Sequence, residues 1–271
     1  MADLPLNLFA DTDPSEHPEL AYQGRINCYV EPPSKDGGRG ASVKMCPGAV
    51  EFIDTGDAGM RGQLEVDGFV YAVMEAAVFK IESDGTKTNI GSIPGRGPVM
   101  MVRNQADPVQ IGIINNQNNY YVIENDVISI VDTSGLPDFV SIASLNQRFI
   151  LAVADGRMFQ TDLVDAHTIR GLDFATAEAD PDGLVRAFAF NGRLYAMGEK
   201  TTEVWGASDA DTGFSFARID AGYIKKGLSA KWSALEVDGT VYFIGSDTGK
   251  DHKVYRLKGY SLEAVSNAAV E

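Results

Sequence analysis

The chain has 271 residues and carries 38 acidic against 23 basic side chains, which leaves a formal net charge of −15 at pH 7. This acidity excludes a general electrostatic site for nucleic acid, because phosphate contacts require clustered lysine and arginine. Two cysteines, Cys28 and Cys46, exclude a disulfide-rich scaffold. No apolar stretch reaches the ~18 residues of a membrane span. The first residues also lack the features of a signal peptide, so we expect a soluble protein with no membrane partner.

The first 40 residues differ from the rest in their proline and glycine content. Prolines recur throughout this segment, and a glycine-rich run at residues 35–40 closes it. No strand or helix period persists there, apart from a short apolar stretch at residues 25–30. We therefore expect an extended N-terminal arm over residues 1–40, followed by a folded domain over residues 41–271.

The folded domain repeats one pattern five times. In each repeat an acidic or amide residue stands at a turn and an apolar run follows it. The spacings between the turn residues are 40, 39, 45 and 47, and the residues are Asp67, Asp107, Asn146, Asn191 and Asp238. A period of this length fits four short strands with their turns. The sequence therefore predicts an all-β fold, a β-propeller with about five four-stranded blades.

The predicted strands follow the same order in each repeat. Runs such as residues 149–153 and 241–244 are apolar on both faces, which requires a cover on each side of the sheet. A more polar strand is expected after each run, at residues 77–82, 119–124, 157–161, 202–205 and 253–257. Residues 163–170 are the one helix candidate of any length. Two acidic segments, 161–184 and 208–215, are expected to be connecting loops.

No motif of a known catalytic or cofactor site occurs in the sequence. The histidines His17, His167 and His252 share no ligand spacing, which favours solvated loop positions. Residues 178–183 are similar to the first half of a calcium loop, but Ala189 stands where a bidentate glutamate is expected. A turn capped by aspartate is the favoured interpretation, and calcium binding stays open. We expect no catalytic residue, no metal site and no cofactor.

A carbohydrate-binding or carbohydrate-active protein is the alternative function, because some five-bladed propellers process sugars with inward-facing carboxylates. Trp205 and Trp232 could stack on a sugar ring. Core packing is the favoured interpretation for both, since an aromatic residue in an alternating strand is usually buried. Three carboxylates and an aromatic side chain at the propeller axis would favour this alternative, whereas a narrow apolar axis would not.

Several phrases of the sequence, taken in order, carry a resemblance to a known family. They are residues 25–31 (RINCYVE), 145–149 (LNQRF), 172–178 (LDFATAE), 190–195 (FNGRLY), 202–205 (TEVW), 222–227 (GYIKKG) and 254–256 (VYR). This ordered set resembles the packaged-DNA stabilization proteins, also called tail accessory factors or tail hub proteins, of short-tailed bacteriophages. The resemblance extends over about residues 20–260.

The resemblance implies a structural virion protein rather than an enzyme. Members of this family form a ring, usually a hexamer, below the portal and adaptor rings of the phage. The ring extends and closes the DNA channel, and it supports the tail needle, tail tip or tailspike proteins. The implied location is the virion tail, assembled in the cytoplasm of the host bacterium. DNA is expected to pass through the channel without specific binding.

The resemblance also indicates which residues of the arm meet a partner. Asn27, Tyr29 and Glu31 are expected either to contact a neighbouring subunit or to pair with the last blade. Family members are longer than this chain, so we expect either a compact version that closes as five blades or a chain from which a C-terminal part beyond Glu271 is missing. If the last blade is incomplete, residues 43–46 or 50–53 are candidates to complete it.

Overall fold

The computed structural model describes residues 28–31, 42–48, 50–56, 59–177, 180, 182–208, 213–246 and 252–266. These residues form strands, turns and irregular segments, with no helix among them. The described residues therefore include no helix of the length and apolarity that crossing a membrane requires. The chain divides into two compact units, Met1–Phe52 with Val265–Glu271, and Ile53–Ala264. In the first unit, β1 (Cys28–Glu31) and β2 (Ser42–Met45) form an antiparallel hairpin.

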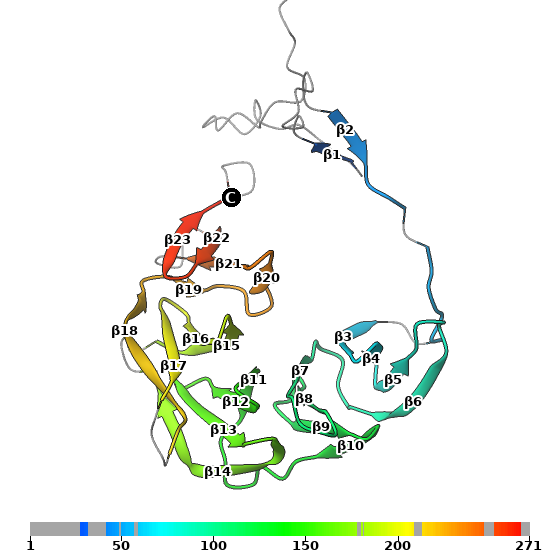
Figure 1. Cartoon of the computed structure of the whole chain (residues 1–271), viewed down its shortest axis with the longest axis horizontal. Helices are drawn as coiled ribbons and strands as arrows, with labels where there is room; N and C mark the ends of the chain where they lie inside the picture. The colour runs from blue at the N-terminus through cyan, green and yellow to red at the C-terminus, as the bar shows by residue number, and fades with distance from the viewer. Residues whose placement is uncertain are drawn as a thin grey trace, which may run out of the picture. The chain divides into compact units, whose positions relative to one another are not determined.

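The second unit is built of antiparallel sheets that follow one another along the chain (Figure 1). The first sheet contains β3 (Met60–Val66), β4 (Phe69–Met74), β5 (Ala77–Ile81) and β6 (Lys87–Ser92). The second contains β7 (Met100–Arg103), β8 (Gln110–Ile114), β9 (Tyr120–Glu124) and β10 (Val127–Ile130). The third contains β11 (Phe139–Leu145), β12 (Arg148–Val153), β13 (Arg157–Asp162) and β14 (Asp165–Thr176). The fourth contains β15 (Leu184–Phe190), β16 (Arg193–Gly198), β17 (Thr202–Ala207) and β18 (Phe216–Ile224).

The fifth sheet differs from the others in its first strand. It contains β19 (Gly227–Leu228), β20 (Leu235–Val237), β21 (Thr240–Ser246), β22 (Lys253–Lys258) and β23 (Ser261–Ala264). Both β19 and β20 pair with β21, so residues 229–234 interrupt what is one continuous strand in the other sheets. Strands that pair in chain order form the meander of a propeller blade, and the predicted β-propeller fold is confirmed.

The repeated turns have one backbone conformation in four of the five repeats. Asp67, Asn146, Asn191 and Asp238 have φ values of 52°, 49°, 47° and 47°. The residues that follow them also have positive φ, as a two-residue type I′ hairpin turn requires. Asp107 is the exception, because its peptide bond to Pro108 is cis. Aspartate and asparagine recur at these turns because they tolerate the left-handed backbone conformation better than most other residues.

The hydrophobic core lies between consecutive sheets. Four clusters of buried side chains each combine residues of two neighbouring sheets. Phe149 and Leu151 of β12 belong to the cluster shared with the second sheet, whereas Ile150 and Ala152 belong to the cluster shared with the fourth. This arrangement explains why such runs are apolar on both faces.

Buried polar bonds connect the sheets in addition to the core. Tyr120 donates its hydroxyl hydrogen bond to the carbonyl of Ala166 in the third sheet, at 2.8 Å. The side chain of Gln160 donates to the carbonyl of Gly213 and accepts from the amide of Ser215, at 3.0 and 2.9 Å. These bonds cost little side-chain freedom once the sheets are packed, and they fix each sheet against the next.

The helix expected at residues 163–170 is wrong. These residues form a turn, with Val164 at a φ of 50°, and then the start of β14, which pairs with β13. The loop expected at residues 161–184 is also wrong, because β14 occupies Asp165–Thr176 within this segment. β-Branched Thr168 and Ile169 suit a strand better than a helix, and the unpaired edge of β13 supplies hydrogen-bond partners that an isolated helical turn lacks.

Candidate functional site

A cavity of about 260 Å³ lies among the first strands of four consecutive sheets. β3, β7, β11 and β15 lie side by side in this order, as the innermost strands of propeller blades do. The cavity is lined by Leu64, by residues 101–103, by residues 142–144 and by residues 186–189. Its charged lining residues are Arg103 and Arg186, and no carboxylate belongs to the lining.

This lining has consequences for catalysis. Glycoside hydrolysis commonly requires a pair of carboxylates about 5–10 Å apart, and the cavity offers arginine and apolar side chains instead. Arg103 is paired with Asp67 at 3.1 Å, at an exposed position. The cavity is therefore unsuited to carboxylate-based sugar chemistry.

Arg186 is the unusual residue of this cavity. It follows a register shift in β15, and its Nη1 donates to the carbonyls of Lys231 and Ala234 at 3.1 and 3.0 Å. Its guanidinium carbon lies 5.2 Å from the centroid of the Phe188 ring. Burial lowers the pKa of Arg186, because desolvation disfavours the charged form. The buried Nε has no acceptor among the described residues.

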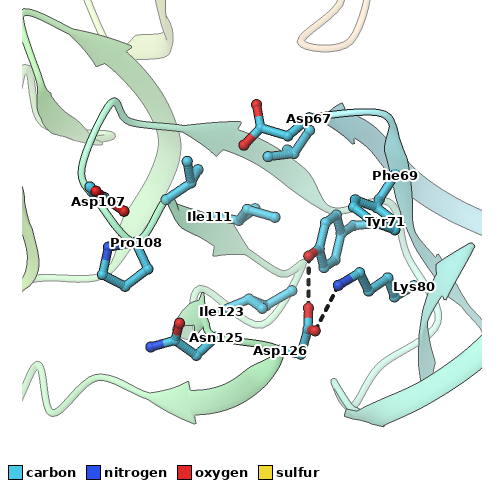
Figure 2. Close-up of a pocket in the computed structure, with 12 residues that line it drawn as sticks. Asp67, Phe69, Tyr71, Lys80, Asp107, Pro108, Ile111, Ile123, Asn125 and Asp126 are labelled. Carbon is cyan, nitrogen blue, oxygen red and sulfur yellow. Dashed lines mark hydrogen bonds and ion pairs between the residues drawn. The ribbon is translucent and has the colours of Figure 1, made fainter. Parts of the chain in front are cut away.

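A second pocket, of about 290 Å³, lies between the first and second sheets (Figure 2). Figure 2 shows Asp126 between Tyr71 and Lys80, with Asp67 and Asp107 apart from this group. Tyr71 donates its hydroxyl to Oδ1 of Asp126 at 2.7 Å, and Nζ of Lys80 lies 2.7 Å from Oδ2. Lys80 also lies 4.2 Å from the centroid of the Phe69 ring.

The electrostatics of this pocket favour a structural role. Burial, followed by the hydrogen bond to Asp126, raises the pKa of Tyr71. Burial alone would raise the pKa of Asp126, but the bonds from Lys80 and Tyr71 lower it overall. Asp126 is thus ionised, and each of its carboxylate oxygens accepts one hydrogen bond, from Tyr71 or from Lys80. Tyr71 keeps its proton. A general acid or base needs a pKa close to the working pH, so this group connects two sheets rather than transferring protons.

The arm residues that the sequence indicated are only partly described. Asn27 lies outside the described residues. Tyr29 and Glu31 lie on β1, opposite Lys44 and Ser42 of β2. Within residues 43–46, a candidate for completing the last blade, residues 43–45 pair with β1. In the same unit Met45, Val50 and Phe52 are exposed, at 78%, 91% and 65% of their surface.

The acidic segment 178–183 uses at least one aspartate as a turn cap. The carboxylate of Asp182 accepts hydrogen bonds from the amides of Lys200 and Thr201, at 2.6 and 2.9 Å, and from the Thr201 hydroxyl at 3.0 Å. Within the ranges that the structure describes, no three His, Cys, Asp or Glu side chains are grouped for a metal ion. Glu178, Ala179 and Pro181 lie outside those ranges.

The two tryptophans have different environments. Trp205 is 7% exposed and packs edge-on against Phe214 with the ring centroids 6.2 Å apart, which confirms core packing. For Trp232 core packing is wrong, because this side chain is 46% exposed in the turn after β19. Lys80 and Arg186 were not singled out by sequence reasoning. The available signal was a single cation within an apolar strand, AVFKI in β5 and LVRAFAF in β15.

The comparison with protein families identifies the family of this chain. The model of the family described as bacteriophage P22 Gp10, β-propeller, matches residues 15–271. The chain belongs to this family. The resemblance to phage packaged-DNA stabilization proteins is thereby confirmed, and the family is one of phage structural proteins. Family membership indicates a component of the virion.

Solved structures share the fold at low sequence identity. Virginiamycin B lyase from Staphylococcus aureus is 13% identical with a TM-score of 0.53, over 77% of this chain and 70% of the lyase chain. PorZ, a surface component of the type-IX secretion system of Porphyromonas gingivalis, is 13% identical with a TM-score of 0.51, over 79% of this chain and 29% of PorZ. The computationally designed protein Ika8 is 8% identical with a TM-score of 0.50, over 81% and 66%. No curated protein matches the chain. At these identities the structures show a common fold alone.

Proposed function

We propose that the chain is a structural protein of the phage tail hub. Copies of the chain assemble as a hexameric ring below the portal and adaptor rings, where they extend and close the DNA channel after packaging. The ring supports the tail needle, tail tip or tailspike proteins. The observation that carries this proposal is the family match over residues 15–271.

The construction of the second unit is consistent with this role. A hub must keep its shape under the pressure of packaged DNA, and consecutive sheets here share buried cores and polar bonds. Non-local strand packing of this kind resists local opening. A carbohydrate-active function has less support, because the cavity among the first strands has no carboxylate in its lining.

The first unit is the proposed contact between subunits. A two-stranded hairpin is at best marginally stable alone in water, and large apolar side chains such as Val50 and Phe52, which follow β2 in the chain, are exposed. We propose that this segment, including Asn27, Tyr29 and Glu31, packs on a neighbouring subunit. Burial of such side chains stabilises an interface by roughly 1.5–3 kcal/mol each.

Light scattering of the purified chain, alone and with a portal–adaptor complex, tests the proposal. We expect a ring, or stoichiometric capture of the chain by the complex. Phe52→Asp is expected to abolish assembly, because it places a charge in the contact. Val127→Asp is the matched control, since Val127 is 64% exposed but lies in the second unit. A monomer that ignores the complex would overturn the proposal.

A further inference from the structure

The first strands of three sheets are irregular at the same place. Register shifts occur between Met60 and Gly62 in β3, between Phe139 and Ser141 in β11, and between Leu184 and Arg186 in β15. In the fifth sheet residues 229–234 stand between β19 and β20 in place of such a bulge. We call residues 229–234 the insertion loop. Bulges commonly change the direction of side chains beside functional sites. The insertion loop is a longer irregularity at the corresponding place in the fifth sheet.

Hydrogen bonds hold the insertion loop in one conformation. The Ser233 hydroxyl donates to the carbonyl of Ala230 at 2.7 Å and accepts from the amide of Ile244 at 2.9 Å. The amide of Ser229 donates to the carbonyl of Ile244 at 2.9 Å. Arg186 adds its two bonds to loop carbonyls. A loop that is already ordered loses little conformational entropy when it binds a partner.

Two cations meet at this loop without a counter-ion. Lys231 follows the bend at Ala230, and its pKa is lowered by burial and then by the nearby charge of Arg186. Neither Arg186 nor Lys231 forms an ion pair with a carboxylate among the residues that the structure describes. Two neighbouring like charges disfavour each other's charged form, and a carboxylate placed beside both would oppose this repulsion. This concentration of positive charge contrasts with the net charge of −15.

Exposed apolar side chains follow Lys231 along the chain. Trp232, Leu235 and Val237 are 46%, 48% and 46% exposed. Nζ of Lys231 lies 5.5 Å from the centroid of the Trp232 ring. Tryptophan and arginine are the residue types that dominate the energetics of protein interfaces. The insertion loop and β20 therefore present a cation pair together with exposed apolar side chains.

We propose that the insertion loop, together with Arg186, binds an acidic peptide segment of a partner protein. A glutamate or aspartate of that segment lies against Arg186 and Lys231, and its apolar neighbours cover Trp232 and Leu235. Charge complementarity selects this occupant. The residues of this site belong to the second unit, whereas the contact proposed between subunits belongs to the first.

A peptide fits this surface better than duplex DNA does. Arg186 also lines the cavity of about 260 Å³ among the first strands, which none of residues 229–234 lines. That volume is below the ~300–1,000 Å³ of typical ligand pockets and leaves room for a side chain. Duplex DNA carries a charge every ~1.7 Å along its axis and would meet the acidic remainder of the chain. A peptide can present one carboxylate among apolar groups.

Fluorescence provides the test. The probe is a short fluorescein-labelled peptide in which glutamate alternates with leucine, titrated with the full chain at ~0.15 M salt, where exposed charges are screened beyond ~8 Å. We expect saturable binding with a change in the emission of the exposed Trp232. Lys231→Met is expected to weaken binding about tenfold, which corresponds to ~1.4 kcal/mol, because it removes one of the two charges that face the carboxylate. Lys225→Met, which removes an exposed lysine outside the loop, is the matched control.

The outcomes separate the site from general electrostatics. Arg186→Met would also remove the hydrogen bonds that hold the insertion loop, so the test relies on Lys231→Met. Circular dichroism verifies that the Lys231→Met variant is folded. Equal weakening by Lys225→Met, or equal competition by a duplex oligonucleotide, would overturn the proposal. Absence of binding to wild-type protein would also overturn it. Because the readout does not involve assembly, failure here and failure of the tail-hub proposal are distinguishable.

Discussion

Single charged side chains connect neighbouring sheets in this protein, and Asp126 shows how. It stands in the turn between β9 and β10, and it accepts hydrogen bonds from Tyr71 and Lys80 of the first sheet. The sheets meet through apolar surfaces, which are tolerant of sliding, whereas a paired charge has one favourable position. Asp126 therefore fixes the register between two sheets.

Asp126→Asn is expected to lower the free energy of unfolding by about 1 kcal/mol. Bonds to charged groups contribute ~1.5–3 kcal/mol, and the 41% exposure of this side chain reduces the effect. The pKa of Asp126 is lowered in the folded state. Its stabilisation is therefore present above its ordinary pKa and is lost as the pH falls through the lowered value. Urea denaturation at neutral and acidic pH measures both effects.

A control separates this inter-sheet bond from ordinary turn capping. Asp132 is an exposed aspartate whose carboxylate accepts the amide hydrogen bond of Ser134 within its own turn, at 2.8 Å. Asp132→Asn should therefore leave the contact between the first and second sheets intact. In the Lys80→Met background, Asp126→Asn should cost clearly less than in the wild type. Additive effects of the two substitutions would contradict the proposed pairing.

Tyr223 provides a second pH-dependent contact. Its hydroxyl donates to Asp180 at 2.5 Å, and this bond, followed by burial, raises the pKa of Tyr223 to about 12. Because the folded pKa is raised, the stabilisation is complete below the ordinary pKa of 10.0 and is lost as the pH rises towards 12. Ultraviolet difference titration of wild type against Tyr223→Phe measures this pKa. Asp180→Asn should return it towards 10.0, and an unchanged titration would refute the contact.

At the scale of elements, the repeated turns allow one sheet to be tested against another. The second turn position is glycine in three hairpins, Gly68, Gly192 and Gly239, but glutamine in the third sheet, where Gln147 has a φ of 63°. A left-handed conformation costs ~1–2 kcal/mol for a residue with a side chain, and the greater freedom of unfolded glycine offsets ~0.5–1 kcal/mol. Gln147→Gly is therefore expected to stabilise the protein by about 0.5–1 kcal/mol.

The converse substitution is the matched control. Gly68 has a φ of 85°, and an added Cβ there would meet no atom within 4 Å. Gly68→Gln should thus destabilise the protein through backbone strain alone, by a similar amount. Thermal unfolding of both variants measures the pair. Changes of the same sign in both would show that the two turns are not equivalent.

The same turns explain how far the sequence determines the fold. An acidic or amide residue recurs at them with the blade period, so the five blades could be predicted even though Asp107 does not adopt the left-handed conformation. The interruption between β19 and β20 could not, because residues 229–234 contain no strong turn signal such as glycine or proline. The contacts in the pocket of Figure 2 also escape prediction. Tyr71 and Asp126 are 55 residues apart, and a repeat period identifies strands without specifying which side chains meet between sheets.

At the scale of the whole molecule, charge sets the relation to DNA. A protein that lines or closes a DNA channel must let the duplex pass, and strong phosphate contacts would hinder that passage. The net charge of −15 makes each copy repel DNA. Four of the arginines are in addition paired with acidic side chains. Arg103, Arg157, Arg170 and Arg256 form ion pairs with carboxylates.

We therefore expect no measurable binding of duplex DNA by the purified chain. Fluorescence anisotropy with a labelled duplex at ~50–200 mM salt is the measurement, because phosphate-mediated affinity falls by ~10³–10⁵ over this range for proteins with several contacts. A basic protein of similar size, titrated in parallel, verifies that the assay detects binding. Micromolar affinity that weakens steeply with salt would mean that positive charge gathers on one face despite the net acidity. In that case the chain would hold the duplex directly. Retention of the packaged DNA would then not depend on closure of the channel by the ring.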